Sequence, residues 1–161
     1  MNTNDENSID HIDKLLLSLL QKNALASTEH LGSEVGLSAT AAKRRVNKLR
    51  NNGAIIKDVS IVDPKRVGFE IFSLVFVNLE RDRRDIVNSF RKDIAENPRV
   101  TAAFYTTGDA DFVLLVASRS LSDYDAFTQD FFWENPNIRS FNTMVVLDRV
   151  KFGFELPILE K

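Results

Sequence analysis

Residues 36–53 read GLSATAAKRRVNKLRNNG, and this stretch has the features of one amphipathic helix. Ser38 is a typical N-cap residue, and Gly53 stands where a glycine commonly ends a helix. At 100° per residue the apolar side chains share one face, and these are Ala42, Val46 and Leu49. The opposite face is basic. We therefore expect one face to pack against the protein and the other to meet an anionic partner.

Two shorter helical patterns precede this stretch. The first begins near Asp10, with apolar residues at helical spacing through Leu20. The second runs from Ser27 to about Val35 and contains Gly32, which costs a helix about 1 kcal/mol relative to alanine. Close approach of a neighbouring segment would explain this glycine. Two helices joined by about three residues, the second one basic, indicate a helix-turn-helix motif within a three-helix domain. A plain three-helix bundle with a charged outer face is the alternative.

The charges of the chain are segregated, although the net charge of its 161 residues is only −2. Residues 1–34 carry a net charge of −4, residues 35–60 carry +5 and the remainder carries −3. The absence of cysteine excludes disulfide frameworks, thiolate catalysis and zinc-finger ligand sets. No apolar run approaches the roughly 18 residues that span a bilayer, and the polar, acidic N-terminus does not resemble a signal peptide. We expect a cytoplasmic protein without a membrane partner, metal or cofactor.

The pattern changes after Gly53. Residues 55–62 alternate with period two and predict a strand that ends at Asp63-Pro64. A series of strands and helices follows, in which Ser122, with Asp125 three residues on, is the expected cap of the second helix. The predicted elements are a strand over 69–79, a helix over 81–97, strands over 100–107 and 112–117, a helix from 122 to Pro136 and a strand over 142–147, with a possible edge segment over 150–154.

This order of strand, helix, strand, strand, helix, strand is typical of a ferredoxin-like α+β fold. We expect a helix-turn-helix domain of the winged type over residues 1–53, a β hinge over 54–68 and a ferredoxin-like antiparallel sandwich domain over 69–161. Two helices cover one face of such a sheet, yet the first and third strands are apolar on both faces. The open face is therefore expected to mediate dimerisation, unless loops or the 55–62 strand cover it.

Four motifs resemble those of the Lrp/AsnC family of transcription regulators. The family pattern LDxIDxxILxxL is matched by residues 9–20, and VGLSxxxxxxRVxxLxxxGxI is matched by residues 35–55. A GDxD turn stands at residues 108–111, and a TxxVVL-like last strand stands at residues 143–147. The likeness covers roughly residues 9–153. It implies an N-terminal DNA-binding domain, a β hinge, and a C-terminal ligand-sensing domain that dimerises through its sheet.

The resemblance further implies that such dimers associate, often into octamers, and bind amino acids or related metabolites near the GDxD turn where dimers meet. The chain departs from the family pattern at Gly32, where alanine is usual. It departs again at Asn137, where glycine is frequent, and here the bulky cluster Phe131-Phe132-Trp133 lies nearby. The second departure is expected to affect assembly or the effector pocket.

The basic helix supplies the candidate DNA contacts. In helix-turn-helix proteins, residues early in the second helix contact base edges while flanking groups bind phosphates. The groove-facing candidates are Thr40, Lys43, Arg44 and Asn47, and the phosphate candidates are Ser38, Lys48 and Arg50. Arg45 lies about 60° from the packing stripe. It is either an internal strut paired with a carboxylate or a further phosphate contact.

The GDxD turn has two interpretations. From the residues alone, Gly108 and Asp109 are ordinary hairpin residues. The resemblance implies instead that backbone N–H groups and carboxylates of the turn bind the charged groups of an amino acid, with nearby threonines adding hydroxyl contacts. The candidate effector residues are Thr106, Thr107, Gly108, Asp109, Ala110, Asp111 and Thr143.

These features predict a sequence-specific transcription regulator that binds double-stranded DNA as a homodimer or larger assembly, modulated by an amino acid or related metabolite. The alternative is a small-molecule-binding module whose helix-turn-helix mainly compacts DNA without sequence preference. An enzyme is disfavoured, because the only histidines, His11 and His30, lie on helices of the DNA-binding half without a catalytic constellation. A single-stranded RNA binder is also disfavoured, because the adjacent Phe104 and Tyr105 must point to opposite faces of a strand.

Overall fold

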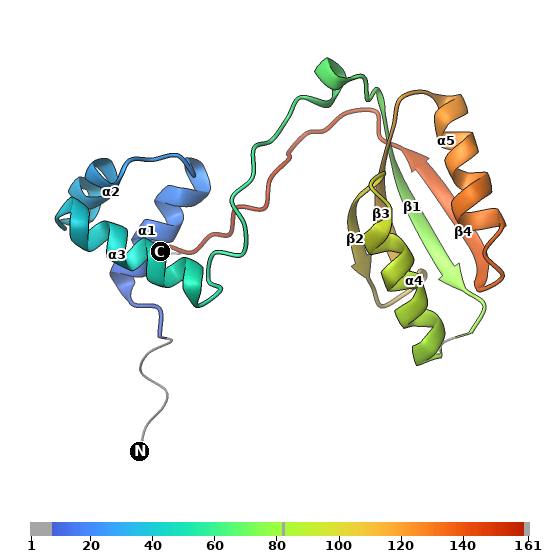
Figure 1. Cartoon of the computed structure of the whole chain (residues 1–161). Helices are drawn as coiled ribbons and strands as arrows, with labels where there is room; N and C mark the ends of the chain where they lie inside the picture. The colour runs from blue at the N-terminus through green and yellow to red at the C-terminus, as the bar shows by residue number, and fades with distance from the viewer. Residues whose placement is uncertain (1–7, 82, 160–161) are drawn as a thin grey trace. The chain divides into compact units, whose positions relative to one another are not determined.

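The computed structural model describes residues 8–81 and 83–159, which form two compact units (Figure 1). Of the described residues, the first unit contains 8–61 and 151–159. The second unit contains residues Val62–Val150.

Three helices build the first unit, and they are α1 (His11–Lys22), α2 (Thr28–Val35) and α3 (Ala39–Asn51). Each helix begins directly after a cap residue whose side chain accepts a hydrogen bond from a backbone N–H three positions on. These caps are Asp10, Ser27 and Ser38, and the last of them is the N-cap that the sequence predicts. In α1 the side chain of Asp13 also accepts from the backbone N–H of Asp10, which completes a capping box.

The core of the first unit lies between the three helices. Its fully or nearly buried apolar residues are Leu16, Leu20, Leu31, Ala42, Val46 and Leu49. Gly32 marks a close approach, since a Cβ atom built at this position would stand 2.6 Å from the carbonyl oxygen of Leu37. The turn between α2 and α3 therefore packs directly on the backbone of α2, which accounts for a glycine inside that helix.

The residues that follow α3 correct one prediction. Residues 55–63 contain no strand, and Ile56 is 95% exposed. A strand is held by hydrogen bonds to a neighbouring strand, and among the described residues of this single chain no strand pairs with this segment. The edge segment expected over 150–154 is likewise not a strand. The only regular element of the linker is a 3₁₀ turn over Pro64–Val67.

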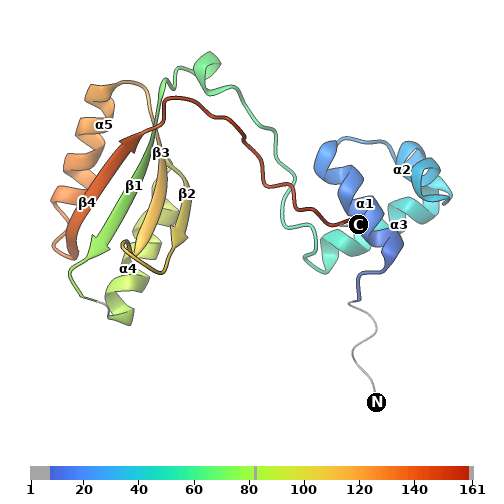
Figure 2. The same cartoon turned by 180° about the vertical axis from the view of Figure 1, so that it is seen from behind.

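The C-terminal residues return to the first unit. The backbone N–H of Leu156 donates to Oε1 of Gln21 at 2.7 Å, and Nε2 of Gln21 donates to the carbonyl oxygen of Leu156 at 3.1 Å. One side-chain amide of α1 thus satisfies both backbone groups of a tail residue. In both views the tail runs near residues 55–61 (Figures 1 and 2).

The second unit confirms the predicted element order. Its elements are β1 (Ile71–Leu79), α4 (Arg84–Glu96), β2 (Val100–Tyr105), β3 (Phe112–Ser118), α5 (Leu121–Thr128), a π-helical turn (Gln129–Trp133) and β4 (Ile138–Val145). The four strands form one sheet in the order β2-β3-β1-β4, and every neighbouring pair is antiparallel. Both helices lie on one face, in front of the sheet in Figure 1 and behind it in Figure 2.

The two faces of the sheet differ in burial. Alternate residues of β1 and β3 are buried beneath the helices, as are Phe90, Phe127 and Phe132 from the helical layer. The opposite face is also apolar, yet Phe104 is 51% exposed there. By strand alternation and register, its residues are Phe72, Leu74, Phe76, Phe104, Val113, Leu115 and Met144, a set named here the open face.

The cap of α5 is Ser120 and not the predicted Ser122. The pattern Ser-x-x-Asp occurs twice in this region, at 120–123 and at 122–125. The hydroxyl of Ser120 accepts from the backbone N–H of Asp123 at 3.1 Å. Asp123 is itself held, because its carboxylate accepts from the backbone N–H of Arg119 and pairs with Arg99, each at 2.8 Å. These two contacts, one local and one with the distant Arg99, favour the earlier of the two equivalent patterns.

Candidate nucleic-acid interface and effector turn

The outer side of α3 forms one continuous polar surface, named here the α3 surface. It is lined by Thr40, Lys43, Arg44, Asn47, Lys48, Asn51 and Asn52. All four groove-facing candidates belong to it, together with the phosphate candidate Lys48. The surface contains three cationic side chains and no acid, so an anionic partner would be favoured along its whole length.

Two residues of the α3 surface were missed by the sequence reasoning. Asn51 lies one helical turn beyond Asn47, and that i, i+4 spacing is the signal that could have identified it. Asn52 ends the helix, and its Oδ1 accepts from the backbone N–H of Ala54 at 3.2 Å. Asn52 thus has a structural role, while the amide of Asn51 is exposed.

Arg45 does not line the α3 surface. Its guanidinium donates to Oδ2 of Asp10 at 2.7 Å and to Oδ1 of Asp13 at 2.9 Å, and both acids belong to the start of α1. Asp13 is only 3% exposed, so this ion pair joins α1 to α3 inside the unit. Of the two roles considered for Arg45, the geometry is that of the internal strut.

The hydrogen bonds around this strut change the pKa of Asp10. Its pKa lies below the ordinary value, chiefly because the carboxylate accepts a hydrogen bond from the backbone N–H of Asp13 and next because it accepts one from Arg45. The charged form of Asp10 is therefore the one that the fold stabilises.

The other phosphate candidates already make local contacts. The hydroxyl of Ser38 accepts from the backbone N–H of Ala41 at 3.2 Å, which leaves its own proton available to a phosphate oxygen. Nε of Arg50 lies 3.2 Å from Oδ2 of Asp58 in the linker, and both side chains are largely exposed. This surface pair is weak, so Arg50 can exchange a carboxylate for a phosphate at little cost.

The GDxD turn is held by its own residues. Oγ1 of Thr106 donates to the carbonyl oxygen of Ala110 at 2.6 Å, and Oδ2 of Asp111 accepts from the backbone N–H of Leu79 at 2.8 Å. Thr106 and Asp111 therefore shape the turn and fasten it to the end of β1. Asp109 and Thr107 are exposed and available to a ligand, and Gly108 has a φ of +111°, a conformation that favours glycine.

Thr143 stands apart from the other candidate effector residues. It belongs to β4 and pairs with Val75 of β1, on the face that the helices cover. In the sheet, β1 separates β4 from the β2-β3 hairpin that carries the turn. Its hydroxyl forms a 2.5 Å hydrogen bond with the hydroxyl of Tyr124. Burial raises the pKa of Tyr124. The structure thus assembles six of the seven candidates at the turn and gives Thr143 a packing partner on α5.

Within the described ranges, no group of three or more His, Asp or Glu side chains could hold a metal ion. In the same residues, no helix is both long and apolar enough to cross a membrane.

Comparison with known proteins identifies both halves of the chain. Residues 9–50 match the AsnC-type helix-turn-helix domain, and residues 73–156 match the Lrp/AsnC ligand binding domain. The chain belongs to the Lrp/AsnC family. It is a transcriptional regulator with a helix-turn-helix DNA-binding domain and a ligand-binding domain.

Relatives of this Lrp/AsnC regulator cover nearly its whole length. It is 47% identical over 150 residues to the uncharacterized HTH-type transcriptional regulator y4tD of Sinorhizobium fredii, covering 93% of this chain and 89% of that protein. It is 33% identical to the transcriptional regulator AzlB of Bacillus subtilis, covering 94% and 97% of the two chains.

Solved structures share its fold. The transcriptional regulator NMB0573 of Neisseria meningitidis, crystallised as an L-Met complex, superposes with a TM-score of 0.87 at 22% identity, covering 94% of this chain and 97% of that one. Escherichia coli AsnC gives a TM-score of 0.81 at 25% identity, with 92% and 98% covered.

Proposed function

We propose that this Lrp/AsnC regulator binds specific sequences of double-stranded DNA through the α3 surface. The observation that carries the proposal is the composition of that surface, in which three cations and two exposed asparagine amides project from one helix with no acid among them. Cations supply affinity for phosphates, while amides and guanidinium groups can distinguish base edges in the major groove. Non-specific compaction would need only the cations.

The side chains divide into two roles. Arg44 and Lys43 donate to guanine O6 and N7, and Asn47 forms paired hydrogen bonds with adenine, as these residue types do in the major groove. Lys48, Arg50 and the hydroxyl of Ser38 bind phosphates. Asn51 extends the same row toward the end of the helix. Arg45 is assigned no DNA contact, because its guanidinium is held by Asp10 and Asp13.

The test compares Arg44→Ala and Lys48→Ala on a selected duplex and on a shuffled duplex over a range of salt concentrations. Arg44→Ala is expected to cost roughly 1–3 kcal/mol on the selected site only, and to relax one base position. Lys48→Ala is expected to weaken both duplexes alike and to reduce the salt slope by about one unit. Lys14→Ala, an exposed lysine on α1, serves as the control.

Two results would contradict this assignment. If both variants bind both duplexes as the unmodified protein does, the α3 surface is not the DNA contact. If the unmodified protein binds selected and shuffled duplexes equally at physiological salt, the compaction alternative holds.

Two further parts of the proposal concern the second unit. The open face of the sheet joins two copies face to face, because contiguous exposed apolar surface of this kind is typical of an interaction surface and sheets pack well in this manner. The resulting dimer carries two α3 helices, which suits a two-fold DNA site.

An amino acid is the proposed effector, bound at the exposed part of the GDxD turn. The carboxylate of Asp109 would pair with the ligand ammonium group, and backbone N–H groups of the turn together with the Thr107 hydroxyl would bind the ligand carboxylate. The likeness in fold to a regulator crystallised with L-Met supports this ligand class.

A panel of amino acids tests the effector proposal through the melting temperature and the sedimentation of the protein. A ligand at 100 times its dissociation constant should stabilise the protein by about 2.7 kcal/mol. Asp109→Asn should remove most of this response, while Thr143→Val should leave it in place. A panel in which no amino acid shifts either melting or assembly would rule out amino-acid sensing.

A further inference from the structure

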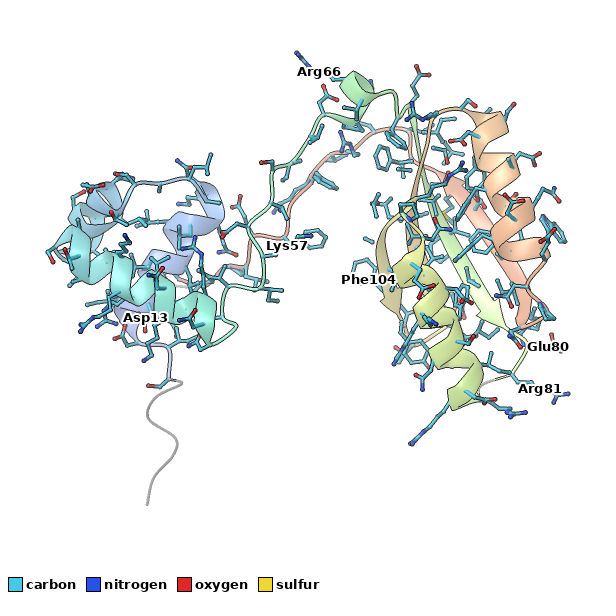
Figure 3. All side chains as sticks on the ribbon, in the orientation of Figure 1. Asp13, Lys57, Arg66, Glu80, Arg81 and Phe104 are labelled. Carbon is cyan, nitrogen blue, oxygen red and sulfur yellow. The ribbon has the colours of Figure 1, made fainter. Side chains whose placement is uncertain are left out.

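Two serine side chains lie inside the core of the second unit. Ser73 of β1 and Ser118 of β3 are both 0% exposed. They belong to the face that the helices cover, because each stands two residues from a core valine of its own strand, Val75 or Val116. Phe104, which is labelled in Figure 3, belongs instead to the open face. The buried residues around the two serines are apolar, so the presence of two hydroxyl groups there needs an explanation.

Neither hydroxyl has a hydrogen-bond partner among the described protein atoms. Thr128 is different, although it is also buried in this unit, because its Oγ1 donates to the carbonyl oxygen of Asp125 at 2.8 Å. Buried hydroxyl groups in native proteins nearly always bond to another protein group or to an ordered water. Two unpartnered hydroxyls in one core therefore point to a bound water.

The two serines are diagonal neighbours on paired strands. In the register of β1 and β3, Ser73 pairs with Val116, and Ser118 pairs with Ile71. Diagonal neighbours on one face of a sheet are about 7–8 Å apart. This separation is too long for a direct bond between two short side chains, but it suits a bond through one water. Serine is also smaller than valine or leucine, so the two serines leave room that larger side chains would fill.

The row of hydroxyl groups continues onto β4. Thr143 pairs with Val75, two residues from Ser73, so Thr143 is the diagonal neighbour of Ser73 on the other side of β1. The hydroxyl of Thr143 is bonded to that of Tyr124 on α5. Hydroxyl groups thus cross three strands beneath the helices, from Ser118 through Ser73 to Thr143. Polar surroundings of this kind hold internal waters, whereas apolar cavities stay dry.

We propose that one internal water lies between Ser73 and Ser118 and forms a hydrogen bond with each hydroxyl. Buried waters form about two to four hydrogen bonds, and the two serines supply two of them. The site lies between β1 and β3, which are the two central strands of the sheet. The water satisfies both hydroxyl groups, which the protein atoms around them do not.

Substitution by alanine tests the bridge, because alanine is similar to serine in size. Ser73→Ala leaves Ser118 without the water that joins it to β1, so this variant should unfold at a lower urea concentration than the unmodified protein. Ser118→Ala should do the same. The double variant S73A/S118A removes both hydroxyls together with the water. Its shift in urea midpoint, at equal protein concentration, should therefore be no larger than that of one single variant.

Two other patterns would overturn the proposal. If the hydroxyls have no partner at all, each single variant should be more stable than the unmodified protein, and the two gains should add. If each hydroxyl bonds separately to the backbone in another rotamer, the two losses should add. The control is Ser89→Ala, at an exposed serine of α4, and its effect should add to that of Ser73→Ala.

The water can also be observed directly in the whole chain. A crystal structure at high resolution should show one ordered water within about 2.5–3.0 Å of both Oγ atoms. Magnetic relaxation of the water oxygen nuclei should count one long-lived water fewer in S73A/S118A than in Ser89→Ala and in the unmodified protein. A direct bond between the two Oγ atoms, or an unchanged number of long-lived waters, would contradict the bridging water.

Discussion

At the scale of single residues, the pair formed by Arg45 and Asp13 is the most consequential contact of the first unit. Replacing Arg45 by methionine keeps most of the aliphatic stem but leaves the buried carboxylate of Asp13 without its cation. We expect a loss of roughly 1–3 kcal/mol in the free energy of unfolding, measured by urea denaturation. Lys48→Met, with the same change on the α3 surface, should be nearly neutral for stability while weakening DNA binding.

The second ion pair of Arg45, with Asp10, predicts a pH dependence. The folded state lowers the pKa of Asp10, so its contribution to stability is present above the ordinary pKa of about 3.9 and is lost as the pH falls through the lower folded value. The difference in melting temperature between the unmodified protein and Arg45→Met should therefore narrow as the pH falls below about 4. A difference that stays constant from pH 7 to pH 3 would show that the charge of Asp10 does not matter.

Gly32 offers a second test at this scale. Alanine favours helices by up to about 1 kcal/mol over glycine, but its Cβ would meet the carbonyl oxygen of Leu37 at 2.6 Å. The clash should dominate, because rigid backbone must move, and we expect Gly32→Ala to destabilise the protein by about 1–3 kcal/mol in chemical denaturation. Gly153→Ala, where a Cβ meets nothing within 4 Å, is the control. Equal stability of the two variants would contradict the close approach.

At the scale of elements, mutation can test which of two equivalent Ser-x-x-Asp patterns caps α5. Ser120→Ala removes the hydroxyl that accepts from the N–H of Asp123 and should cost about 1 kcal/mol. Ser122→Ala, two residues on and exposed, should change stability by less than about 0.5 kcal/mol. Thermal unfolding of both variants measures the difference, and a larger loss at Ser122 would reverse the assignment of the cap.

The elements also show what the sequence can predict. Helix caps in the first unit were predictable, because an N-cap bond involves residues only three apart. The cap of α5 was not, because Arg99 holds Asp123 from elsewhere in the fold. Residues 55–62 have the periodicity of a strand, but periodicity does not supply a hydrogen-bonding neighbour.

At the scale of the whole molecule, the open face can be tested by charge. Phe104→Arg places a cation within the proposed apolar contact and should convert dimers to monomers in sedimentation experiments. Leu121→Arg makes a comparable change at an exposed apolar residue of α5 and should leave the dimer intact. A dimer that survives Phe104→Arg but not Leu121→Arg would move the contact from the sheet to the helices.

The order of elements along the second unit was predictable from the alternation of strands and helices, and the α3 surface was predictable from helical geometry. The position of Thr143 was not. Its place near a family motif suggested a role at the turn, but the strand order sets β1 between β4 and the hairpin that carries the turn. Likewise, the strut role of Arg45 depends on where α1 crosses α3, which no spacing within either helix determines.

The bond between Gln21 and the C-terminal tail has a consequence for the order in which the protein is made. Leu156 follows Gln21 by 135 residues. At about 5–20 residues per second, a ribosome adds Leu156 roughly 7 to 27 seconds after Gln21. The three helices can form well before this time. The hydrogen bonds between Gln21 and Leu156 can form only after the sheet unit has been synthesised. The DNA-binding unit is thus the first to begin folding and among the last to be finished.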